Sequence, residues 1–151
     1  MAGASIAVFL AGLFTLSSFS IRTARAGRET VAASLIVQER LDQLRRGNWT
    51  NVTDPTYIQT QMSKPAGSAA PLSGVTERIT INAYPAASPA PVPIEVRRSA
   101  NGTVTIVSSN ASLRGQPTVR ADVTTTWAGS RRGATRTRTM STVIAQGGIV
   151  K

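Results

Sequence analysis

The chain has 151 residues, which fits one small domain, and a net charge of +10. It contains no cysteine and no histidine, which excludes disulfides, thiolate chemistry, zinc sites of Cys/His type and an imidazole general base. The seven carboxylates are scattered singly along the chain. We therefore predict that the protein is not an enzyme and has no metal site, cofactor or small-molecule substrate.

Fifteen of the 17 cations are arginine. Nine of the arginines fall into three groups: Arg22, Arg25 and Arg28, then Arg45 and Arg46, and finally Arg131, Arg132, Arg136 and Arg138. Arginine forks suit phosphate in lipid headgroups or nucleic acid, whereas the plainer interpretation is a solvated basic surface. Because no nucleic-acid-binding module is recognisable, nucleic acid as a partner stays only an alternative.

Residues 1–21 carry no charged side chain. In helical geometry they would extend roughly 31 Å, enough for the hydrocarbon thickness of a bilayer, so they predict a transmembrane segment. A cleaved signal peptide is the main competitor, because Ala24 and Ala26 have the A-x-A spacing of a processing site. The helical pattern continues through that supposed cut, which favours the transmembrane interpretation.

Small residues recur on one side of this segment. Gly3, Ala7 and Ala11 stand four residues apart, a spacing that lets helices approach closely within a membrane. We therefore predict that these three residues form a helix–helix assembly surface. The alternative is that lipid surrounds the helix on every side.

Residues 22–47 continue the helix with an amphipathic pattern. Ala33, Val37, Leu41 and Leu44 form one apolar stripe, and we expect the last three to be the helix–sheet packing residues. Glu39, Arg40, Asp42, Arg45 and Arg46 are expected on the polar surfaces. Gly47 is typical of a helix end. A coiled coil is disfavoured because the stripe does not persist for three heptads.

Residues 48–74 are predicted to be a connecting loop, with Thr56–Met62 as its only strand-like piece. Residues 75–151 have the alternation of a β-sheet head. Strands are expected at 75–83, 94–98, 103–108, 119–127 and 135–145, with a two-residue hairpin at Asn101-Gly102 and glycines 129 and 133 around the last turn. The predicted fold class is α+β, a long N-terminal helix packed on a small antiparallel β-meander.

Two tracts carry a resemblance to a known superfamily. The helix ends in LIVQERLDQLRRGNW, and the last hairpin reads VTTTWAGSRRGATRTRTMSTVIA. With the apolar N-terminal helix, they make the whole chain resemble a minor type IV pilin or a type II secretion pseudopilin. The resemblance implies a pilin-like fold and a structural subunit of a type IV pilus or type II secretion-like filament, assembled through its N-terminal helix.

The same resemblance implies where the subunit resides and what it meets. It would span the bacterial inner membrane once, with an extracytoplasmic head, and then enter the pilus or pseudopilus. Its partners would be other pilin-like subunits and the assembly machinery. Such proteins begin with a basic leader ending in glycine, followed by a tract with glutamate, and laid on that pattern Met1 falls just after the glutamate. The resemblance therefore predicts an in-frame upstream extension that encodes these features.

Two interpretations from other classes stay open. The chain could be a signal-anchored extracytoplasmic β-domain that acts as a binding or adhesion module without polymerising. Its basic head could also bind DNA, which predicts a steep dependence of affinity on salt concentration.

Overall fold

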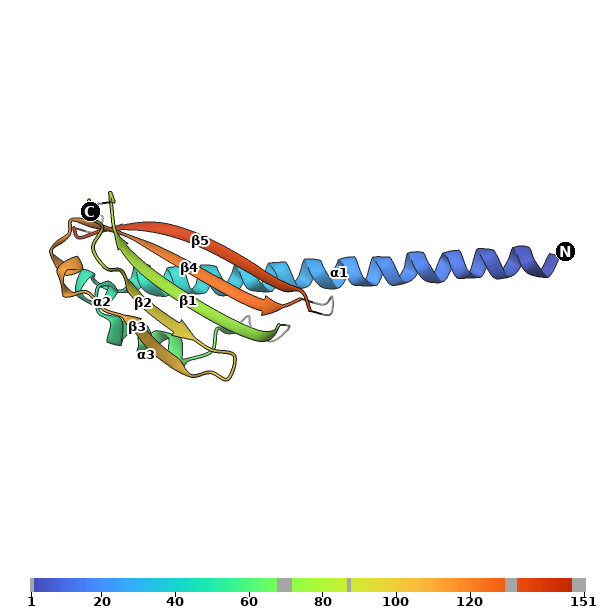
Figure 1. The fold of residues 1–151 in the computed structure, drawn as a ribbon, viewed down its shortest axis with the longest axis horizontal. Coiled ribbons are helices and arrows are strands. Elements are labelled where there is room, and N and C mark those ends of the chain that lie inside the picture. The colour runs from blue at the N-terminus through green and yellow to red at the C-terminus, as the bar shows by residue number, and fades with distance from the viewer. Residues whose placement is uncertain (1, 68–71, 87, 130–132, 148–151) are drawn as a thin grey trace.

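The computed structural model describes residues 2–67, 72–86, 88–129 and 133–147, with side chains from residue 12 onward. A single helix, α1 (Ala2–Arg46), is followed by two short helices and a five-stranded antiparallel sheet. Figure 1 shows α1 extending far beyond the head on its N-terminal side. The α+β class, a long N-terminal helix with an antiparallel sheet, is confirmed.

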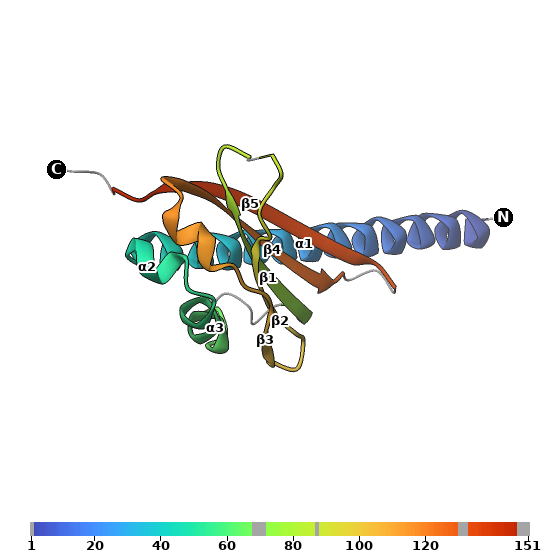
Figure 2. The ribbon, with the colours of Figure 1, turned by 60° about the vertical axis from the view of Figure 1, so that its left-hand side comes forward.

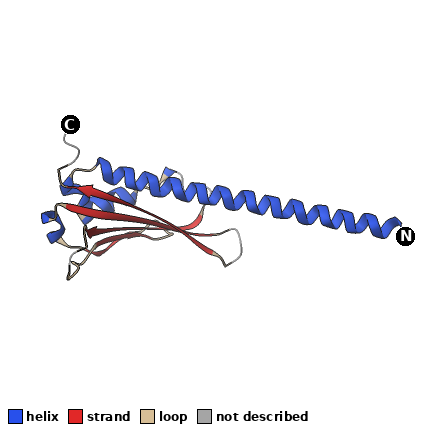
Figure 3. Cartoon of the chain, turned by 90° about the horizontal axis from the view of Figure 1, so that it is seen from above, coloured by secondary structure: helices blue, strands red, loops and turns tan. Residues whose placement is uncertain are grey.

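Burial divides α1 into two parts. Residues 12–25 are exposed at every position, and buried positions recur from Glu29 onward. The change occurs where the head begins to cover one side of the helix, as the view in Figure 3 shows. We call residues 12–28 the projecting part of α1 and residues 29–46 the covered part.

Two short helices replace most of the loop expected after α1. Helix α2 (Trp49–Val52) is capped by the Asn48 side chain. Helix α3 (Pro55–Ser63) begins with proline and is capped by Asp54, whose carboxylate accepts a hydrogen bond from the Thr56 backbone N–H. The prediction of a strand over Thr56–Met62 was wrong. The physical reason is the Asp-Pro cap followed by Ile58 and Met62, which stand four residues apart and are both buried.

The strands lie where the alternation predicted them. They are β1 (Ser73–Ala83), β2 (Ile94–Arg98), β3 (Val104–Ser108), β4 (Thr118–Ala128) and β5 (Thr135–Ala145). Their order in the sheet is β3-β2-β1-β4-β5, so the simple meander was wrong at one connection. After β3 the chain passes through a 3₁₀ turn, η2 (Ala111–Gly115), and returns beside β1. The long β1 thus lies at the centre, paired on both sides.

The hairpin between β2 and β3 is one residue longer than predicted. Ser99 N–H donates to Thr103 O at 2.9 Å, and Gly102 N–H donates back to Ser99 O at 2.9 Å. Gly102 has a φ of 87°, which favours glycine because a Cβ would be strained there. The turn therefore consists of residues 100–102, and Asn101 and Gly102 are its last two residues.

The core lies between one face of the sheet and the helices. Helix α1 packs against β4 and β5, and α3 packs against β2 and β3. Figure 2 shows α1 and α3 on the same side of the sheet. The opposite face of the sheet carries the exposed and half-buried positions of each strand, largely threonine and arginine. The head is therefore a two-layer structure with one open polar face.

Candidate assembly surfaces

The projecting part of α1 carries large apolar side chains in the open. Phe14, Leu16, Phe19 and Ile21 are 74%, 69%, 72% and 65% exposed, and Leu13 is 48% exposed. These residues point to more than one side of the helix, because their spacing does not follow a single stripe. An apolar surface of this kind needs lipid or another protein to cover it.

The predicted assembly residues Gly3, Ala7 and Ala11 belong to the first turns of α1, where side chains lie outside the described residues. The backbone there is helical. Within the described part of the chain, no helix is both long and apolar enough to cross a bilayer.

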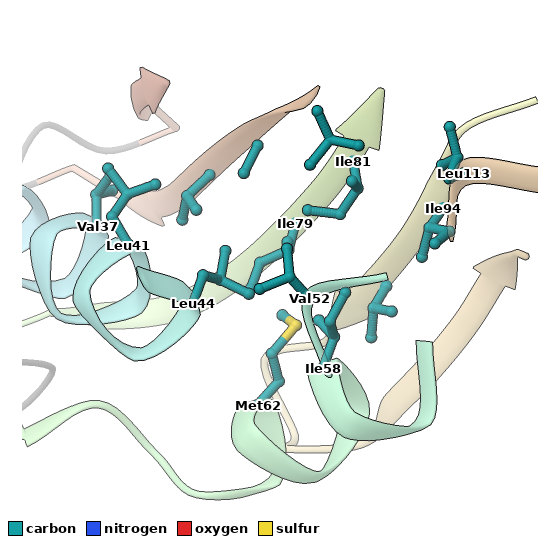
Figure 4. Close-up of a cluster of buried hydrophobic side chains, with 14 of the residues drawn as sticks. Val37, Leu41, Leu44, Val52, Ile58, Met62, Ile79, Ile81, Ile94 and Leu113 are labelled. Carbon is teal, nitrogen blue, oxygen red and sulfur yellow. The ribbon is translucent and has the colours of Figure 1, made fainter. Parts of the chain in front are cut away.

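The predicted packing residues of the covered part lie in the core. Val37, Leu41 and Leu44 are at most 3% exposed and belong to one buried cluster with residues of the sheet and of α2 and α3. Figure 4 shows Leu44 directed toward Val52, with Val37 and Leu41 on the preceding turns of α1. The head packs on this side of α1.

The outer side of the covered part is not fully polar. Val31 and Leu35 stand one helical turn apart and are 61% and 47% exposed. Leu35 borders a shallow depression with Gln38 and Asp42. A second apolar surface of α1 therefore continues past the start of the head.

Arg40 is the main site residue that the sequence interpretation misplaced. It was expected on the polar surface, but its side chain is only 1% exposed. Its guanidinium donates to both Glu77 carboxylate oxygens, from Nε at 2.6 Å and from Nη2 at 3.2 Å. It also donates to Gln43 Oε1 at 3.0 Å, to Gln61 O at 2.9 Å and to Lys64 O at 2.7 Å. All five N–H donors of the arginine are thus used.

This network joins three elements of the head. Arg40 belongs to α1 and Glu77 to β1, while the two carbonyls lie at the C-terminal end of α3. A cation at that end also complements the dipole of α3. Arg98 of β2 approaches Glu77 Oε1 at 3.4 Å as well. A buried, fully bonded ion pair fixes how the helix sits on the sheet, because shifting either element would leave a charge unpaired.

The open face of the sheet holds an open groove of about 520 Å³. Threonines form cross-strand hydroxyl pairs along it, Thr124 with Thr139 at 3.0 Å and Thr126 with Thr137 at 3.3 Å. Arg78 and Arg97 of this face share the Glu95 carboxylate. Nearer the other end, the Asp122 carboxylate raises the pKa of the Arg120 guanidinium through a 2.8 Å hydrogen bond and its charge. The groove therefore presents hydroxyl groups and ion-paired arginines, which could hydrogen-bond to a polar ligand.

Among the described residues, no group of His, Cys, Asp or Glu side chains could hold a metal ion. Comparisons with protein-family models, with curated proteins and with solved structures found no match to this chain.

Proposed function

We propose that the chain is a structural subunit of a type IV pilus or type II secretion-like filament, of the minor pilin or pseudopilin kind. The observation that carries the proposal is the division of α1. One continuous helix has an exposed apolar part that projects from the molecule and an amphipathic part that is seated under an antiparallel sheet. The two sequence tracts described above support it.

In this proposal each part of α1 has its own surroundings. Before assembly, residues 1–21 lie in the bacterial inner membrane and the head lies on its extracytoplasmic side. During assembly, the same residues exchange lipid for the helices of neighbouring subunits in the filament core. Close approach of backbones at small residues provides the packing energy, since apolar side chains gain no hydrophobic driving force when they leave lipid.

The test of the proposal is what copurifies with the full chain from the membranes and sheared surface material of its own cells. We expect other pilin-like subunits in both fractions, because a filament subunit contacts its neighbours before and after extraction. Recovery of the chain as a monomer in the membrane fraction alone, without such subunits, would contradict the proposal.

A second candidate is an anchored extracytoplasmic β-domain that binds a ligand or adheres without polymerising. The open threonine- and arginine-lined groove of the sheet favours it, because no element of the described head covers that face. It predicts that substitutions in the groove, such as Thr126→Val, abolish adhesion, while substitutions in residues 1–21 that preserve membrane insertion have no effect.

A further inference from the structure

Basic side chains from distant parts of the sequence meet at one end of the head. In the register of the last hairpin, Arg136 lies opposite Trp127 and Arg138 lies opposite Thr125. These positions are near the end of β4, and Figure 1 shows this end of β4 and β5 directed toward the N-terminus of α1. Arg22, Arg25 and Arg28 occupy the helix where it leaves the head at this same end.

We call Arg22, Arg25, Arg28, Arg136 and Arg138 the basic collar. Four of them are exposed and Arg136 is half-buried. Arg25 approaches the buried Glu29 at 3.8 Å. None of the ion pairs formed among the described residues includes any of the other four collar arginines. The collar is thus a concentration of positive charge with little compensation from described carboxylates.

The opposite end of the head is different. Asp42 pairs with Arg45, Asp54 pairs with Arg114, and Asp122 pairs with Arg120. Charges of both signs are therefore interspersed at that end, in contrast to the collar.

We propose that the basic collar binds anionic phospholipid headgroups on the leaflet that the head faces. This inference rests on the proposed function, in which the apolar start of α1 enters the membrane. The helix rise places Arg22 and Arg28 about 9 Å apart along the axis. That is close to the thickness of one headgroup layer, about 5 to 8 Å.

The collar also has the chemistry for this partner. A guanidinium donates paired hydrogen bonds to phosphate oxygens and stays charged at any physiological pH. The position of the charges favours lipid over other polyanions, because the collar follows directly on exposed Phe19 and Ile21, which need an apolar surrounding. Each arginine near an anionic surface strengthens binding about five-fold.

The experiment measures partition of the purified full chain into vesicles of phosphatidylcholine alone and of an equimolar mixture with phosphatidylglycerol. The test variant carries Arg22→Gln, Arg28→Gln and Arg138→Gln. The matched control carries Arg46→Gln, Arg114→Gln and Arg120→Gln, which removes the same charge from exposed arginines at the other end of the head.

We expect the parent chain to prefer the anionic vesicles and the test variant to lose about a hundred-fold of that preference. The control should stay within about two-fold of the parent, and added salt should weaken the parent's preference. Arg22→Gln alone, outside the folded head, should lose about five-fold, so the inference can be tested even if the triple variant folds poorly. Equal losses in the test and control variants would overturn the inference, because net charge alone would then explain the binding.

A second arm distinguishes lipid from nucleic acid. If the test variant loses binding to a DNA duplex, measured by fluorescence anisotropy, but keeps its preference for anionic vesicles, the inference is wrong. Failure of the inference also differs from failure of the proposed function. In the first case the lipid preference is absent while filaments still contain the chain, and in the second the chain is missing from sheared filaments.

Discussion

The two parts of α1 belong to one helix but bury their apolar side chains in different ways. In the projecting part, Phe14 and Leu16 are mostly exposed, whereas Leu41 and Leu44 in the covered part are almost fully buried. The projecting part has apolar residues on several sides, and the covered part packs a single stripe against the sheet. The covered part therefore contributes to the stability of the fold, whereas the apolar side chains of the projecting part are not buried by the head.

The largest expected effect concerns Arg40, which joins α1 to β1 and α3. Arg40→Met should lower the free energy of unfolding by about 3 to 5 kcal/mol, because it leaves the buried Glu77 without its main partner. The measurement is urea unfolding of the full chain in detergent micelles, followed by the fluorescence of Trp49 and Trp127. Arg22→Met, in the projecting part, is the control and should change the value by less than about 0.5 kcal/mol.

The same pair allows a sharper test. Glu77→Met combined with Arg40→Met should recover part of the lost stability, because the double variant no longer buries a lone carboxylate at this position. If the double variant lost as much stability as the two single variants added together, the two residues would not act as a pair.

The next effect compares one substitution in both parts of the helix. Leu41→Ala should cost about 2 to 5 kcal/mol, because it opens a cavity in the core. Leu16→Ala should cost less than about 0.5 kcal/mol in the same unfolding measurement, since that side chain is 69% exposed. If the two losses were similar, the division of α1 would be wrong.

The smallest effect on stability is expected at Leu35, on the outer side of the covered part. Leu35→Gln should change the free energy of unfolding by less than about 0.5 kcal/mol, because the side chain is 47% exposed. It should nevertheless lower the amount of the chain in sheared filaments if the outer surface of α1 contacts neighbouring subunits. Unchanged assembly would confine the assembly surface to the projecting part and the turns before it.

Much of the sheet could be predicted from the sequence because its strands alternate. In β1 and β4, buried and less buried positions follow each other as the period of two requires. The end of α1 could also be predicted, because Arg45, Arg46 and Gly47 follow the last apolar residue of the stripe, Leu44. A Cβ added at Gly47 would lie 3.2 Å from the Leu44 carbonyl oxygen and 3.4 Å from the Tyr57 ring, so close packing also favours glycine there.

The strand order could not be read in the same way. Local alternation is the same whether β4 pairs with β3 or with β1, and the choice depends on contacts between distant segments. Helix α3 was not predicted because its segment has the composition of a loop and only two buried apolar residues, Ile58 and Met62, show the helical spacing. Asp54-Pro55 is nevertheless a helix-start signal.

The buried pair of Arg40 and Glu77 was missed because each residue was judged by its own charge. Arg40 stands three residues after Val37 and four before Leu44, so it falls within the stripe. Glu77 stands two residues before Ile79 and so lies on the same face of β1. An arginine on the apolar face of a helix and a carboxylate on the apolar face of a strand together signal a buried ion pair.

The measurement that tests the central claim most directly is the ratio of filament-associated to membrane-associated protein after mechanical shearing. Ala7→Leu should leave the chain in the membrane fraction and lower this ratio strongly, because a bulky side chain prevents close approach of neighbouring helices. Leu10→Ile is the control and should be tolerated, since volume and apolarity are kept. If Ala7→Leu assembles as well as the parent, the start of α1 is not an assembly surface and the anchored β-domain becomes the better account.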